Sequence, residues 1–197
     1  TSQFPLNNDE SDMDYSAQFD KATSYEEFLK KYATPEQNRR WSEFYESVSL
    51  STEQTNLLKS FVREMKVLVM AGAWCGDCVN QCPIFQKFSE INPQIQVRFA
   101  DRDDNPELSA ELKTCGGARV PAIVFLSEDG QFCGRAGDRT LSKYRSVIAK
   151  LEGATCPTGL AVDQELTKSV IQDWLDEFER IQWMLRTSSR LRELHND

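Results

Sequence analysis

Two cysteines separated by two residues form the segment of this sequence best suited to chemistry, Cys75-Gly76-Asp77-Cys78. An apolar run at 66–71 precedes it and a helical pattern follows, so we expect Cys75 at the N-terminal end of a helix. Unpaired backbone N–H groups at such an end stabilise a thiolate, the nucleophile of disulfide exchange. Cys78 follows one turn later, where its thiol can resolve a mixed disulfide formed by Cys75. The spacing predicts a redox-active Cys75–Cys78 disulfide, and we expect no bound organic cofactor beside it.

A metal site is the alternative interpretation of the same sulfurs. Cys75, Cys78 and Cys82 offer three thiolates and Cys115 a fourth, which could form a structural zinc site. Such a site usually shows a second close pair of ligands, and Cys115 stands alone in the sequence. The only histidine, His195, lies near the C-terminus. We therefore expect no metal and keep a Cys-ligated zinc domain as the weakest hypothesis.

The segments around the dithiol show alternating strand and helix signals. We expect strands at 66–71, 95–100, 122–126 and 131–135, the last two joined by a turn at 127–130, and helices from Cys75 or Gly76 to Ser89, at 106–113 and at 141–151. This order predicts an α/β fold with a mixed central β-sheet flanked by helices.

Helical patterns extend the chain on both sides of this unit. Thr34-Pro35-Glu36-Gln37 and Ser51-Thr52-Glu53-Gln54 are capping signals that start helices before it. After a break at Cys156-Pro157-Thr158-Gly159, an apolar stripe from Leu166 to Leu185 predicts one long helix. The stripe either packs on its own domain or forms the seam of a homo-oligomer or a partner surface. We divide the chain into an N-terminal extension packed on the core at 1–65, a core at 66–156 and a C-terminal amphipathic helix extension at 157–197.

The composition narrows the classes of partner. The net charge is −8 and no long Lys/Arg run occurs, which argues against nucleic acid as the main partner. No stretch approaches the ~20 apolar residues of a membrane span, and the polar, acidic start is unlike an export signal. We expect a cytoplasmic protein, although a sequence that begins at Thr1 could already have lost such a signal.

The motifs resemble those of a known family. Ala73-Trp74-Cys75-Gly76-Asp77-Cys78, followed by Val120-Pro121-Ala122-Ile123-Val124-Phe125, is similar to the thioredoxin superfamily over about Lys66 to Gly153. The resemblance is closest to the bacterial "thioredoxin family protein" group with a Trp-Cys-Gly-Asp-Cys active-site motif. It implies a thioredoxin fold with helical N- and C-terminal extensions.

The resemblance also implies roles for individual residues. Cys75 would be the attacking cysteine and Cys78 the resolving one. Substrate binding would fall to the residues beside the dithiol and at the start of the third strand, with Pro121 as a cis-proline: Trp74, Gly76, Val120 and Pro121. The plainer alternatives are packing for Trp74, a turn for Gly76 and a strand edge for Pro121.

Two departures from the thioredoxin pattern affect the dithiol. Val69 stands where thioredoxins have a buried aspartate that accepts a proton from the resolving thiol, so the proton relay differs or is slower. Asp77 replaces a proline, and its charge should disfavour the Cys75 thiolate, raise the pKa of Cys75 and make the couple more reducing. Asp77 could instead be a solvated carboxylate at the helix start, favoured by the helix dipole.

The remaining cysteines are auxiliary candidates at most. Cys82 lies one turn beyond Cys78, where it could trap an oxidised sulfur or simply be buried as a small apolar residue. Cys115 lies in a glycine-flanked loop before Pro121 and is the better candidate. We assign no role to Cys133 or Cys156.

The leading hypothesis is a thiol–disulfide oxidoreductase that reduces disulfides of proteins or small molecules through the Cys75 thiolate, with electrons from an external donor. The alternative is a redox-sensitive protein-binding module on a thioredoxin fold, because a fold alone does not separate the two.

Overall fold

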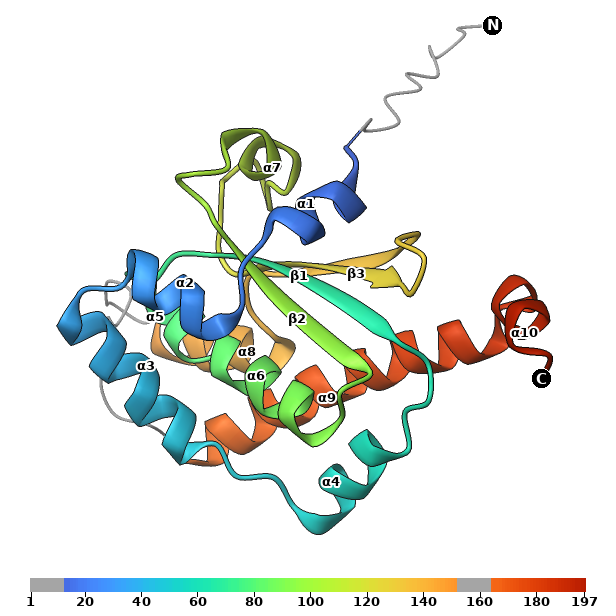
Figure 1. Cartoon of the computed structure of the whole chain (residues 1–197). Helices are drawn as coiled ribbons and strands as arrows, with labels where there is room; N and C mark the ends of the chain where they lie inside the picture. The colour runs from blue at the N-terminus through green and yellow to red at the C-terminus, as the bar shows by residue number, and fades with distance from the viewer. Residues whose placement is uncertain (1–12, 152–163) are drawn as a thin grey trace, which may run out of the picture.

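A computed structural model describes residues 13–151 and 164–197 of the chain (Figure 1). Four short helices come first: α1 (Tyr15–Lys21), α2 (Tyr25–Tyr32), α3 (Pro35–Ser47) and α4 (Thr52–Lys59). The central unit then runs β1 (Met65–Ala71), α5 (Gly76–Val79), α6 (Cys82–Ile91), β2 (Ile95–Asp101), α7 (Pro106–Glu111), β3 (Ala122–Ser127), β4 (Phe132–Gly137) and α8 (Leu141–Lys150). Helices α9 (Gln164–Thr187) and α10 (Ser189–His195) follow.

The N-terminal helices begin where their side chains can satisfy the first free backbone N–H groups. Thr34 and Gln37 form a reciprocal capping box at the start of α3, and Ser51 and Gln54 form one at α4, as the sequence predicts. A third capping box, from Ser24 to Glu27, starts α2, which the sequence analysis did not delimit.

The sheet has four strands in the order β2-β1-β3-β4. Strand β1 pairs with β2 in parallel, β3 is antiparallel to β1, and β4 is antiparallel to β3. All four predicted strands are present, each within two residues of its expected ends. The carboxyl end of β1 and the start of β3 therefore meet at one edge, which brings the dithiol segment and Val120-Pro121 to the same end of the sheet.

The single helix expected from Cys75 or Gly76 to Ser89 is divided. Helix α5 ends at Val79, and α6 begins at Cys82 with Pro83 in its first turn. A proline in a helix interior lacks an N–H donor and clashes with the carbonyl four residues earlier, which here belongs to Val79. The chain instead turns through Asn80 and Gln81, and this turn gives Gln81 a buried position behind the dithiol.

Helices cover both faces of the sheet (Figure 1). Helix α1 packs over one face, where Phe19 lies beside Lys66 and Arg98. On the other face, Phe178 of α9 contacts Phe85 and Phe88 of α6 and Phe125 of β3.

The apolar stripe of α9 is buried in this core, from Val170 through Trp174 to Leu185. Its own domain therefore covers the stripe, as the plainer of the two sequence interpretations expected. The structure is thus an α/β thioredoxin-like fold with helical extensions at both ends. The break at Cys156-Pro157-Thr158-Gly159 and the domain boundary at 156/157 lie outside the described residues.

Candidate active site

The dithiol lies where β1 leaves the sheet and α5 begins. Cys75 is the N-cap residue of α5, and its N–H donates to the carbonyl of Gly72 at 3.0 Å. Cys75 is partly exposed, whereas Cys78 has no exposed surface, and both are free thiols. Cys75 therefore has surface that a large substrate can reach, whereas Cys78 has none.

Both sulfurs lie in surroundings that affect their ionisation. A hydrogen bond with Cys78 and partial burial raise the pKa of Cys75, while the backbone N–H groups of Cys78 and Asp77 act in the opposite direction. Burial raises the pKa of Cys78 well above its ordinary value, and its sulfur accepts a 3.5 Å hydrogen bond from the N–H of Gly72. In this reduced state the pair favours two protonated thiols that share a hydrogen bond.

The loop before β3 contacts the dithiol directly. The Val120–Pro121 peptide bond is cis, and the Cys75 thiol donates to the Val120 carbonyl at 3.4 Å. Val120 itself is 5% exposed. The tertiary structure thus brings Cys75, Cys78 and Val120-Pro121 together in one site.

Trp74 directly precedes Cys75 in the sequence. Trp74 is 44% exposed, and the Arg102 guanidinium stacks over its ring with the carbon atom 4.4 Å from the centroid. Gly72 lies against the indole, because a Cβ built there would be 2.7 Å from the ring. Gly76 faces open space, with nothing within 4 Å of a Cβ built on it.

Asp77 has a partner that no sequence pattern indicates. Its Oδ2 accepts from Nε of Arg139 at 2.9 Å and from Nη2 at 2.8 Å. Both side chains are only 18% exposed, so the carboxylate is neither isolated nor fully solvated. Arg139 follows β4 and is distant from Asp77 in the sequence, and no local pattern connects the two residues.

Comparison with known proteins identifies the family of this chain. The Thioredoxin family model matches residues 22–150. The chain belongs to the thioredoxin family. A search of curated proteins finds no match.

Solved structures resemble this thioredoxin-family chain over most of its length. A protein of unknown function from Pseudomonas aeruginosa is 16% identical, with a TM-score of 0.67, and the match covers 86% of this chain and 96% of that one. An HIV epitope scaffold is 19% identical, with a TM-score of 0.63, over 82% and 98%. These two likenesses concern the fold. Mitochondrial thioredoxin 3 from Saccharomyces cerevisiae, in its oxidised form, is 26% identical, with a TM-score of 0.34, over 55% and 99%.

Each helical extension of this thioredoxin-family chain donates one indole hydrogen bond to the active-site segment. Trp41 of α3 donates to the Ala73 carbonyl at 2.9 Å, and Trp174 of α9 donates to Oε1 of Gln81 at 3.0 Å. Both tryptophans are buried on their helices, and nothing in their spacing indicates these acceptors. The residues before and after the dithiol are therefore held from opposite ends of the chain.

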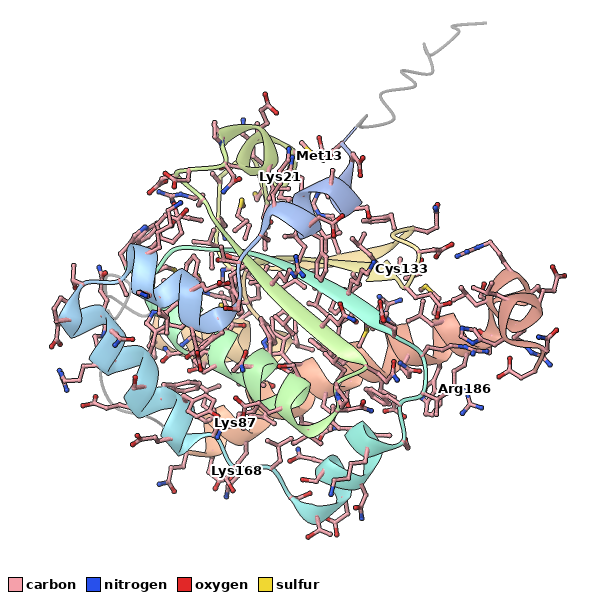
Figure 2. The ribbon with its side chains drawn as sticks, in the orientation of Figure 1. Met13, Lys21, Lys87, Cys133, Lys168 and Arg186 are labelled. Carbon is pink, nitrogen blue, oxygen red and sulfur yellow. The ribbon has the colours of Figure 1, made fainter. Side chains whose placement is uncertain are left out.

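The other cysteines differ in accessibility. Cys82 has no exposed surface and hydrogen bonds with the Cys78 sulfur, while Cys115 is exposed in the turn Thr114–Gly117 with φ of 51°. Figure 2 places Cys133 on the β3–β4 hairpin, across the molecule from α5. Cys156 lies outside the described residues, and the auxiliary roles considered for Cys82 and Cys115 stay predictions.

Val69 in this thioredoxin-family chain is fully buried in β1, paired with Phe99 and Ile123.

In residues 13–151 and 164–197, no group of three or more His, Cys, Asp or Glu side chains is arranged to hold a metal ion. Within the same ranges, no helix is both long enough and apolar enough to cross a membrane.

Proposed function

We propose that this protein is a thiol–disulfide oxidoreductase that reduces disulfides through Cys75 and Cys78. The observation that carries the proposal is the difference in exposure between the two thiols. Cys75 is partly exposed beside the Val120 carbonyl, and Cys78 is buried behind it. An accessible nucleophile with a protected resolving thiol is the arrangement that two-step disulfide exchange requires.

The reaction begins when Cys75 loses its proton. The Cys75 thiolate attacks one sulfur of the substrate disulfide, forms a mixed disulfide and releases the other substrate sulfur as a thiolate, which takes up a proton. Cys78 then loses its proton and attacks the Cys75 sulfur, which gives the Cys75–Cys78 disulfide and the second substrate thiol. Two electrons and two protons pass from the protein dithiol to the substrate.

An external thiol or reductase restores the dithiol, so the reaction needs no bound organic cofactor or metal. The substrates are disulfides of proteins or small molecules, with Trp74, Gly76, Val120 and Pro121 as the binding surface. The Trp-Cys-Gly-Asp-Cys motif supports a place in the bacterial "thioredoxin family protein" group. A reductase is also consistent with a cytoplasmic location, since that compartment keeps thiols reduced.

The test is catalytic reduction of insulin disulfides with dithiothreitol as the electron donor. Cys75→Ser is expected to abolish turnover, and Cys78→Ser to accumulate a mixed disulfide at Cys75 that peptide mass spectrometry detects. Cys133→Ser is the matched control, because Cys133 is also partly exposed. Full turnover by Cys75→Ser would contradict the proposal. If the wild type forms the Cys75–Cys78 disulfide without multiple turnovers, the hypothesis of a redox-sensitive binding module replaces that of an oxidoreductase.

A further inference from the structure

An ion pair lies directly beside the candidate dithiol. Asp77 is in the first turn of α5, two residues after Cys75, and one of its carboxylate oxygens accepts two hydrogen bonds from Arg139. With 18% of each side chain exposed, solvent screens these charges less than it screens a surface pair. Loss of one partner would therefore leave a poorly screened charge in the Cys75–Cys78 segment or next to it.

Hydrogen bonds to Asp138, the residue before Arg139, hold this part of the backbone in place. The Asp138 carbonyl accepts a 2.8 Å hydrogen bond from Nε2 of Gln81, whose side chain also donates to the Asp77 carbonyl. The Asp138 carboxylate accepts from Arg119 at 3.2 Å and from the hydroxyl of Tyr144. The 138–139 segment thus contacts the loop before Pro121 and the dithiol helix, which are the two halves of the site.

Other charges near the dithiol are also paired. Arg102, which stacks on Trp74, pairs with Asp103 at 2.8 Å, and Arg119, adjacent to Val120, pairs with Asp138. Among the ion pairs found in the described ranges, Asp77 with Arg139 is the one that includes a residue of the Cys75–Cys78 segment itself. A change to either partner therefore changes the charge nearest to Cys75 along the chain.

We propose that Arg139 is a positioning residue that holds Asp77 and offsets its negative charge beside Cys75. The inference deepens the proposed function, and the effect of Arg139 on catalysis rests on that function. It also changes the expectation, drawn from Asp77 alone, that the carboxylate charge raises the pKa of Cys75. The carboxylate acts on Cys75 as half of a nearly neutral pair, and only loss of Arg139 exposes its full charge to the thiolate.

The test is a double-mutant cycle in the reduced full-length protein. Iodoacetamide reacts with the thiolate and releases iodide, so the rate of Cys75 alkylation against pH, followed by peptide mass spectrometry, gives the midpoint of its ionisation. Arg139→Gln should raise this midpoint by about 0.5–1 pH unit, because the Asp77 charge then opposes the thiolate. Asp77→Asn should lower it by a similar amount, because the negative charge of Asp77 is then removed while the Arg139 cation stays. The double variant should return close to the wild type, and Arg139→Lys should shift the midpoint less than Arg139→Gln.

Arg190→Gln is the matched control. Arg190 also pairs with an aspartate, Asp129, and α10 lies at the end of the molecule opposite α5 (Figure 1). This variant should leave the Cys75 midpoint unchanged. Circular dichroism establishes that each variant is folded, and Arg139→Lys and the double variant keep the test informative if Arg139→Gln unfolds.

Two outcomes would overturn the inference: unchanged midpoints in both single variants, or shifts of the same sign in both. Alkylation does not require turnover. Loss of insulin reduction with an intact cycle would therefore remove the proposed function and leave the role of Arg139 in place.

Discussion

The indole N–H of Trp174 donates a 3.0 Å hydrogen bond to Oε1 of Gln81, and both residues are buried. Gln81 occupies the turn between α5 and α6, and its Nε2 donates to the Asp77 and Asp138 carbonyls. Helix α9 therefore holds the residue that connects the dithiol helix to the 138–139 segment. In this chain the helical extension is part of the support of the active site.

Trp174→Phe removes this donor and keeps most of the apolar volume. Oε1 of Gln81 is then buried without its partner, so we expect the free energy of unfolding to fall by about 1–3 kcal/mol in urea denaturation. Trp183→Phe is the control, since Trp183 is 38% exposed and its N–H donates to the partly exposed Glu179. An equal loss in both variants would show that the hydrogen bond to Gln81 contributes nothing specific.

Trp41→Phe tests the corresponding contact on the other side of the dithiol. The Ala73 carbonyl loses its 2.9 Å hydrogen bond, and we expect slower Cys75 alkylation together with a stability loss of about 1–3 kcal/mol. The alkylation rate distinguishes positioning from simple stability. A variant that is less stable but reacts at the wild-type rate would assign Trp41 to packing alone.

Gly72→Ala is expected to disturb Trp74. An added Cβ would be 2.7 Å from the indole, so the ring must move, and overpacking of this kind typically costs about 1–3 kcal/mol. Gly76→Ala is the matched control, because its Cβ would meet nothing within 4 Å. Tryptophan fluorescence and urea denaturation of the two variants provide the comparison, and identical behaviour would contradict the contact.

The stability of the reduced protein should fall above pH 8.5. A hydrogen bond with Cys78 and burial raise the pKa of Cys75, and burial raises the pKa of Cys78. The unfolded chain releases thiol protons near its ordinary pKa of about 8.5 while the folded protein retains them, so the free energy of unfolding decreases by up to about 1.4 kcal/mol per pH unit for each thiol. Oxidation to the Cys75–Cys78 disulfide removes both protons and this dependence. Urea denaturation of the reduced and the oxidised protein at pH 7.5 and 9.5 checks this prediction. Equal losses of unfolding free energy in the two redox states would contradict it.

Asp138→Asn should destabilise the protein at neutral pH. Burial opposes ionisation of Asp138, but hydrogen bonds from Tyr144 and Arg119 outweigh burial and lower the pKa of this carboxyl group. Its stabilising effect is therefore present above the unfolded pKa of about 3.9 and disappears as the pH falls through the folded value. We expect a loss of about 1–3 kcal/mol at pH 7 that shrinks toward pH 3. The exposed Asp104→Asn, measured in the same way, should change little.

Local sequence patterns were sufficient for the secondary structure near the site. Capping residues such as Thr34 and Ser51, the apolar runs of the strands and the turn at 127–130 act over a few residues, so spacing and residue type alone predict them. Pro83 is the exception, because the expected single helix ran through it although a proline at this position favours a break between α5 and α6.

By itself, the sequence determined that Cys75 and Cys78 lie where a strand meets a helix, because that depends on short-range periodicity. Only the tertiary structure decided which groups surround them: Arg139 beside Asp77, Trp41 on Ala73 and Trp174 on Gln81. Each of these contacts joins residues from distant parts of the chain. Periodicity shows that a side chain faces the interior, but its partner depends on how the helices pack on the sheet.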